Sequence, residues 1–257
     1  MVIWKAHYKD EQHDLDIDIT NTEGDYSSDP ISFTVDGIAF CGTSIFDFQM
    51  SDPDMYETAQ RKFKVLKWGG RYPELNRQTP YCYDLQCYSL DIIIPIPVLR
   101  KSDSGIVQGE LRVYYSYGEH DMNKTQSIVS CDGERVFRHD LKEAVFTLCV
   151  EGKEYSLNCK STYIEDALLE LSKLIKEDYS LKCCFTCRYS DYSPYGSDDY
   201  GTLMCYRKHK EEYLKVDDKD SWFKYAESLP YEMMQETYCC EEYEPRTGCG
   251  GYRGFVD

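Results

Sequence analysis

The first 160 residues alternate between short apolar runs and turn residues, a pattern typical of β-structure. Runs rich in β-branched and aromatic residues are separated by Asp-Gly, Gly-Gly and Glu-Gly pairs, which favour tight turns. Within one run Leu111, Val113 and Tyr115 occupy alternate positions, so they share one face of a strand. Strands are predicted at residues 2–8, 15–19, 31–35, 38–41, 63–68, 81–95, 109–117, 134–138, 144–150 and 154–158. This succession favours an antiparallel β-sandwich or a barrel-like domain.

One segment has the periodicity of an amphipathic helix. Its apolar residues recur on one helical face: Ile164, Ala167, Leu168, Leu171, Leu174 and Ile175. Thr162 and Glu165 have the spacing of a capping box at the start of this helix. We therefore expect a mainly β protein of the α+β class. Its parts would be a β-rich domain at 1–160, a linking helix at 161–178 packed on the sheet, and a small module at 179–257.

The last part of the chain is poor in aliphatic residues but rich in cysteine. Residues 181–257 contain seven of the 13 cysteines, together with many tyrosines. Such a segment buries little apolar surface, so another interaction should hold it together. The amino terminus lacks the pattern of a secretory signal, and the most apolar stretch, 90–99, is too short to span a bilayer. A cytoplasmic location follows as an expectation, with the cysteines acting as thiols and metal ligands.

The spacing of the cysteines predicts a zinc site. Cys184 and Cys187 are separated by two residues, which lets one tight turn present both thiolates to a single ion. Cys205 follows after a turn-rich loop and a short apolar run. Either Cys239 or Cys240 could supply the fourth ligand. Adjacent side chains of an extended segment point in opposite directions, so only one of the two should bind.

Three other interpretations compete with zinc: buried free thiols, a redox-active pair and chance clustering. A redox pair of the thioredoxin type should open a helix, but the turn-rich residues 188–196 disfavour one. Four thiolates would leave no open coordination position, so the Zn²⁺ would be structural and the small module would resemble a zinc ribbon. This favours a non-enzymatic protein. The alternative is a zinc-dependent enzyme in which water occupies one coordination position.

The charge of the chain points to a protein partner. The formal charge is −17, and residues 1–60 contain 13 Asp and Glu against two Lys. Binding to nucleic acid or to an anionic membrane depends on clustered Lys and Arg, so both are disfavoured. A partner protein with a basic face is the expected ligand, and a role in bacterial immunity or defence is a hypothesis compatible with this charge. A solubilising acidic surface is the alternative.

A tyrosine-rich loop is a candidate surface for that partner. Tyrosine and arginine are enriched at the energetically important positions of protein interfaces, and a proline turn would hold the loop rigid. The candidate partner-binding residues are Asp191, Tyr192, Tyr195, Tyr252 and Arg253. The alternative is that these tyrosines pack the small module in place of aliphatic residues.

Several motifs resemble an uncharacterised bacterial family of domain-of-unknown-function proteins. They are CCFTCRYSDYSPYG at 183–196, YGTLMCYRKHKEEYLKV at 200–216, QETYCCEEYEPR at 235–246 and GYRG at 251–254. The resemblance covers roughly residues 81–254, whereas the first 80 residues match least well. It implies no established activity. The family pattern favours Cys240 over Cys239, so the implied ligand set is Cys184, Cys187, Cys205 and Cys240.

Overall fold

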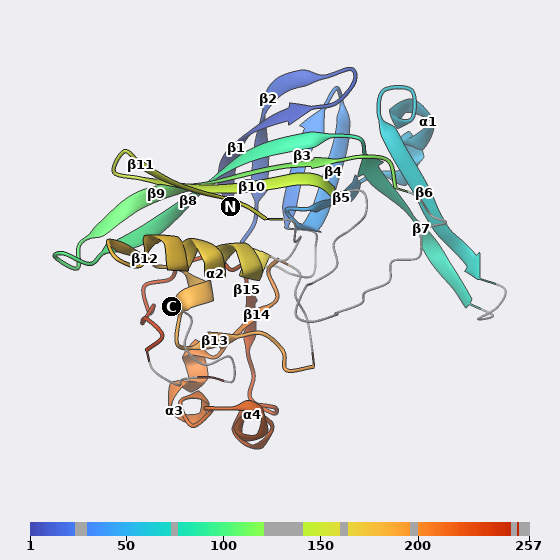
Figure 1. Cartoon of the computed structure of the whole chain (residues 1–257). Coiled ribbons are helices and arrows are strands. Elements are labelled where there is room, and N and C mark those ends of the chain that lie inside the picture. Colours follow the sequence, from blue (N-terminus) through green and yellow to red (C-terminus); the bar gives the residue numbers. More distant parts are fainter. Residues whose placement is uncertain are drawn as a thin grey trace.

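The computed structural model describes residues 1–23, 30–72, 77–120, 141–159, 164–195, 200–247 and residue 251. Its main feature is one antiparallel sheet of 12 strands, which curls into a half-barrel (Figure 1). Eleven strands follow the order β11-β10-β9-β8-β1-β2-β3-β4-β5-β7-β6, and β12 pairs with β8. The bounds are β1 Val2–Lys9, β2 Asp14–Asn21, β3 Ile31–Val35, β4 Ile38–Ser44, β5 Asp47–Met50, β6 Lys64–Tyr72, β7 Arg77–Gln86, β8 Ser89–Arg100, β9 Ile106–Tyr117, β10 Leu141–Val150, β11 Lys153–Asn158 and β12 Tyr179–Leu181.

The prediction of a mainly β, antiparallel and barrel-like fold is confirmed. One predicted strand, 81–95, is wrong in extent, because the structure divides it between β7 and β8. The chain turns there at Cys87, whose φ of 54° lies in the left-handed region. The predicted strand at 134–138 lies outside the described residues. The short strands β5 and β12 were not predicted.

Two prolines lie inside β8, at positions where the sheet does not need their missing N–H groups. Arg100 donates to the carbonyl of Gly105, so even-numbered positions of β8 bond to β9 and odd-numbered positions face the opposite side. Pro95 and Pro97 therefore face away from β9. On that side the pairing with β1 ends at Ile93, and the pairing with β12 begins only at Val98. Pro95 lies between these two pairings, and the carbonyl of Pro97 accepts the N–H of Lys182 (2.9 Å) where the pairing with β12 ends.

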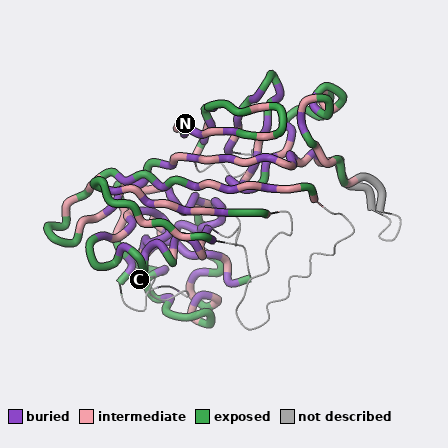
Figure 2. The backbone as a smooth tube through the Cα atoms, turned by 45° about the horizontal axis from the view of Figure 1, so that its top comes forward, coloured by how far each residue is buried: buried purple, intermediate pink, exposed green. Residues whose placement is uncertain are grey.

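The helix α2 (Ile164–Ile175) lies against the sheet and closes its core (Figure 1). Ile164, Leu168 and Leu171 are fully buried, as the periodicity predicts. Leu174 is different from the prediction: half of it is exposed, because it lies at the margin of the apolar face. The predicted cap at Thr162 lies outside the described residues. Along the strands, Figure 2 shows buried positions alternating with intermediate or exposed ones.

The carboxyl-terminal part adds a second, smaller sheet below α2 in Figure 1, with the order β13-β14-β15. Its strands and nearby helices are β13 Ser190–Asp191, β14 Leu203–Cys205, α3 Lys210–Tyr213, α4 Lys219–Tyr225 and β15 Glu232–Met234, while the large sheet carries α1 at Tyr56–Ala59. The described part of the chain contains no helix that is both long and apolar enough to cross a membrane.

A reciprocal pair of amides joins the small sheet to the large one. Asn21 Nδ2 donates to Gln235 Oε1 (2.8 Å), and Gln235 Nε2 donates to Asn21 Oδ1 (2.9 Å). Both side chains are buried. Tyr200 packs edge-on against Trp4 beside them, with ring centroids 6.5 Å apart. The core is therefore continuous from the half-barrel into the carboxyl-terminal part.

Candidate metal centre and groove

Two of the predicted ligands lie on one tight turn. Cys184–Thr186 forms a single 3₁₀ turn, and the N–H of Cys187 donates to the carbonyl of Cys184 (3.1 Å). Both thiol-bearing residues are buried. A two-residue spacing on such a turn brings the two sulfurs to the same side, as a shared ion requires.

Backbone hydrogen bonds bring the other two cysteine segments to this turn. Ser190, just after the turn, pairs with Cys205 in the β13–β14 ladder. The N–H of Cys184 donates to the carbonyl of Tyr238 (2.6 Å), which places the segment of Cys240 alongside. Three segments that are far apart in the sequence therefore meet at one place.

The four thiols influence one another's ionisation. Burial raises the pKa of Cys184 far above its ordinary value, and Cys205, Cys187, Cys183 and Cys240 raise it further. Burial raises the pKa of Cys205 to about 11, and Cys187 and Cys240 contribute to the rise. Thiols so placed ionise readily only beside a cation, because bringing their negative charges together in a buried site is costly.

Cys239 faces a different group. Lys182 Nζ donates to Cys239 Sγ (3.1 Å), and the charge of Cys239 acts on the buried Cys183. Cys240 instead acts on Cys184, Cys187 and Cys205. This division is the one expected when adjacent side chains point in opposite directions.

The thiols are neighbours, but they do not form a coordination sphere. Within the described ranges no three His, Cys, Asp or Glu side chains are arranged to hold a metal ion. None of the described cysteines forms a disulfide bond. The zinc site therefore stays a prediction.

Arg207 lies beside Cys240, the predicted fourth ligand. Burial lowers the pKa of Arg207, but interactions with Cys240 and Glu232 outweigh this effect and raise it. A Zn²⁺ ion with four thiolates would carry a net charge of 2−. The guanidinium of Arg207 is placed to offset part of that charge, as groups around metal ligands commonly do.

A buried ion pair stabilises the same part of the chain. Arg246 Nη1 lies 3.6 Å from Asp191 Oδ2, and both side chains are almost completely buried. Tyr213 donates its hydroxyl to the same Asp191 oxygen (2.7 Å), while Arg246 donates to the carbonyls of Cys187 and Ser190. Arg246 thus connects the cysteine turn to the carboxyl-terminal segment.

Gly251 packs directly on this ion pair, so replacing it should be costly. Its φ is 74°, and an added Cβ would lie 2.5 Å from Arg246 Nη1 and 2.6 Å from Asp191 Oδ2. We expect Gly251→Ala to lower the free energy of unfolding by about 1–2 kcal/mol for the left-handed backbone and about 1–3 kcal/mol more for the displaced atoms. Urea unfolding followed by circular dichroism measures the loss.

Gly152→Ala is the matched control. Gly152 has a nearly equal φ of 77°, but nothing lies within 4 Å of its added Cβ. It should therefore show only the smaller backbone cost. Equal losses in the two variants would mean that the contact of Gly251 with the ion pair contributes nothing.

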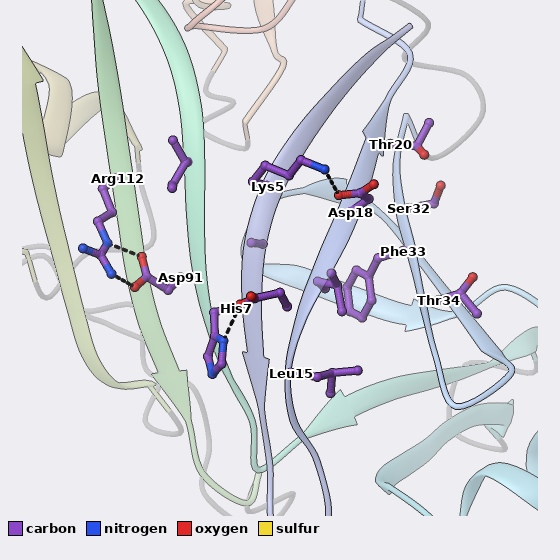
Figure 3. Close-up of a pocket in the computed structure, with 14 residues that line it drawn as sticks. Lys5, His7, Leu15, Asp18, Thr20, Ser32, Phe33, Thr34, Asp91 and Arg112 are labelled. Atoms are coloured by element: carbon purple, nitrogen blue, oxygen red, sulfur yellow. Dashed lines mark hydrogen bonds and ion pairs between the residues drawn. The ribbon is translucent and has the colours of Figure 1, made fainter.

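A groove of about 1060 Å³ runs along the face of the sheet that carries Lys5, His7 and Asp18 (Figure 3). It reaches from Ser32 and Thr34 on β3, across β2 and β1, to Asp91 on β8 and Arg112 on β9. Its lining combines charged and hydroxyl side chains with a few apolar groups, which suits a polar or charged ligand.

The charged side chains of β1 and β2 face one another in register, an arrangement that we call the charge ladder. Its contacts are Lys5–Asp18 (2.6 Å), His7–Asp16 (2.8 Å), His7–Asp14 (2.9 Å) and Lys9–Asp14 (2.6 Å). The hydrogen bond with Asp16 raises the pKa of His7, partial burial lowers it by less, and Asp14 adds to the rise. These groups are exposed, so each pair stabilises the sheet only slightly.

A model of the DUF6304 family, a family of unknown function, matches residues 2–190. The chain belongs to this family. The DUF6304 match begins at residue 2, so it includes the acidic amino-terminal part that the motif resemblance placed outside its range. It ends before Cys205 and Cys240. No curated protein and no solved structure matches the chain.

Of the five candidate partner-binding residues, Tyr195 is the one that the structure places on the surface, 71% exposed. Its hydroxyl donates to Glu227 Oε1 (2.6 Å). Asp191 and Tyr192 are buried, and Tyr192 donates to the buried Glu236 (2.9 Å). Tyr252 and Arg253 lie outside the described residues. A partner that binds this loop of the DUF6304 chain would therefore contact Tyr195. Tyr192 would only support the loop, because it is buried.

The groove was missed in the sequence. Its signal was present: aspartates at positions 14, 16 and 18 alternate with apolar residues, and Lys5, His7 and Lys9 alternate likewise. Period-two charges on two neighbouring strands indicate a cross-strand ladder. The net charge of residues 1–60 does not reveal this pattern, because it ignores the positions of the charges.

Proposed function

We propose that this protein is a non-enzymatic protein-interaction factor whose carboxyl-terminal module is held by one structural Zn²⁺ ion. Cys184, Cys187, Cys205 and Cys240 would bind the ion. The observation that carries the proposal is the meeting of three cysteine-bearing segments through the β13–β14 pairing and the hydrogen bond from Cys184 to Tyr238, while Cys239 accepts from Lys182. Four thiolates close the coordination sphere, so such an ion stabilises structure and leaves no position for a substrate.

The interaction part of the proposal is supported by the acidic amino-terminal strands. The charge ladder ends in a row of aspartates on β2, and Asp16 has a 94% exposed side chain. Exposed carboxylates of this kind attract a partner with a basic face and speed its association. The hypothesis of an immunity or defence role rests on the acidity alone and stays a prediction, as does the cytoplasmic location.

Metal analysis of the native full-length chain tests the zinc site. We expect one zinc per chain, with X-ray absorption showing four sulfur ligands at about 2.3 Å. Cys240→Ser should lose most of the zinc, whereas the adjacent Cys239→Ser should keep it. Zinc loss in the Cys239 variant alone would overturn the ligand assignment. Three sulfurs and one oxygen in the native protein would favour the zinc-dependent enzyme instead.

A further inference from the structure

β2 and β3 pair over only two positions and then separate. Thr20 pairs with Ser32 and Asn21 pairs with Ile31, which closes one end of the gap. At the other end His13 Nε2 lies 3.8 Å from Asp36 Oδ2. Between these contacts residues 14–18 and 33–35 border an opening, and the groove extends into it.

The main chain of β2 presents an unpaired edge to this opening. Thr22 donates to the carbonyl of Pro30 (2.9 Å), so even-numbered positions of β2 direct their N–H and C=O groups toward β3. Asp16 and Asp18 are such positions, and no described residue of β3 pairs with them. An edge of this kind is a template for another extended chain.

The charges alternate in sign from strand to strand toward this edge. They run from Arg112 on β9 to Asp91 on β8, His7 and Lys5 on β1, and Asp16 and Asp18 on β2 (Figure 3). Arg112 Nε donates to Asp91 Oδ1 (2.7 Å), and Asp91 pairs in register with His7. On the far side of Asp16 and Asp18 the next strand offers only the hydroxyls of Ser32 and Thr34. A positive side chain there would continue the alternation.

The inner side of the opening is apolar. Ile17 and Phe33 line it from the core side, 8% and 3% exposed, and Figure 3 shows the Phe33 ring between β2 and β3. Leu15, which is 37% exposed, also lines the groove. In a strand placed along β2, successive side chains would point alternately toward the aspartates and toward these apolar groups.

We propose that the opening between β2 and β3 binds an extended segment of a partner protein in which basic and apolar residues alternate. The segment adds a strand to β2 and hydrogen-bonds to the main chain of Asp16 and Asp18. Its basic side chains meet the carboxylates of these two residues, and its apolar ones pack on Leu15 and cover Ile17 and Phe33. This inference rests on the proposed role in protein binding and adds the site and the class of segment bound.

Amide hydrogen exchange of the full chain tests the site directly. The probe is a synthetic peptide, Gly-Ser-Lys-Val-Arg-Val-Lys-Ser-Gly, blocked at both ends. At a free concentration about ten times its Kd, it should slow exchange at the amides of Asp16 and Asp18 about tenfold. The amides of Ile17 and Ile19 bond to β1 already and are the internal control. Binding that leaves Asp16 and Asp18 unprotected would overturn the proposal.

Two double variants distinguish binding at this site from attraction to the net charge of the protein. Asp16→Asn with Asp18→Asn should weaken peptide binding about fivefold to tenfold, because two exposed ion pairs are lost. Asp52→Asn with Asp54→Asn removes the same charge at the same spacing elsewhere in the acidic region, and it should leave binding unchanged. Equal weakening in both double variants would show attraction to net charge alone and would reject the site. A peptide with Glu in place of Lys and Arg should not bind.

The zinc measurement keeps this proposal separate from the proposed function. The β2 strand contributes no metal ligand, so the Asp16/Asp18 variant should keep its full zinc content. Native zinc with no amide protection by the peptide would reject the groove and leave the zinc-held interaction protein standing. Amide protection in a chain that binds no zinc would reject the zinc site and leave the groove standing.

Discussion

Removing the proposed Zn²⁺ with a chelator is expected to open residues 183–246 to protease, while the amides of β8, β9 and β10 stay protected from exchange. The reason is that only some residues of this part, such as Phe185, Tyr200 and Leu203, belong to the main core. A structural zinc contributes on the order of 10–16 kcal/mol to the folding of small zinc modules. The second apolar cluster that would have to replace it is small, with Tyr206, Tyr213 and Trp222 as its largest members. Limited proteolysis with mass spectrometry locates the cuts.

The control is the same chelator already saturated with zinc, which should leave the digestion pattern unchanged. Cys184→Ser should reproduce the chelated pattern without chelator, because it removes a ligand of the central turn. Unchanged protease resistance after complete removal of the metal would contradict the zinc-held module. The large sheet should survive, since none of its 12 strands carries any of the four cysteines.

Arg246→Ala will lower the free energy of unfolding by about 3–5 kcal/mol, the cost of leaving a buried carboxylate without its ionic partner. Asp191 is fully buried and would keep the hydroxyl of Tyr213 as a donor. The carbonyls of Cys187 and Ser190 would also lose the guanidinium. Urea unfolding of the metal-bound chain gives the value.

Arg188→Ala is the matched control for this loss. Arg188 lies in the same module and pairs with Glu244 at 3.5 Å, but both side chains are partly exposed. Such a pair contributes about 0–1 kcal/mol. Replacing both Asp191 and Arg246 by Ala should cost less than the sum of the two single changes, because no unpaired charge remains. Losses that add would mean that the two groups do not interact.

The strands were predictable where local pattern decides them. Alternation located β3, β9 and β10 because one face of each strand is buried and the other is not. The turn at Cys87 was not predictable, since a cysteine with positive φ carries no turn signal in the sequence. The prolines of β8 were compatible with a strand only because the pairing with β1 ends before them, which depends on the tertiary arrangement.

The candidate sites were likewise predictable only where residues close in sequence decide them. The pair Cys184 and Cys187 is visible as a spacing, whereas the approach of Cys240 depends on the hydrogen bond from Cys184 to Tyr238. The aspartates of β2 are visible as an alternation. The opening beside them is not, because it depends on how soon the pairing of β2 with β3 ends.

The amide pair between Asn21 and Gln235 spans 214 positions of the sequence. A fragment ending at residue 190 would keep the whole region that the family model matches. It would nevertheless leave the side chain of Asn21 without Gln235, Trp4 without Tyr200, and Cys184 without Cys205. The unit that folds is therefore longer than the region that the family model matches. During synthesis, the β1–β2 hairpin must wait until Gln235 is made before the side chain of Asn21 gains this partner.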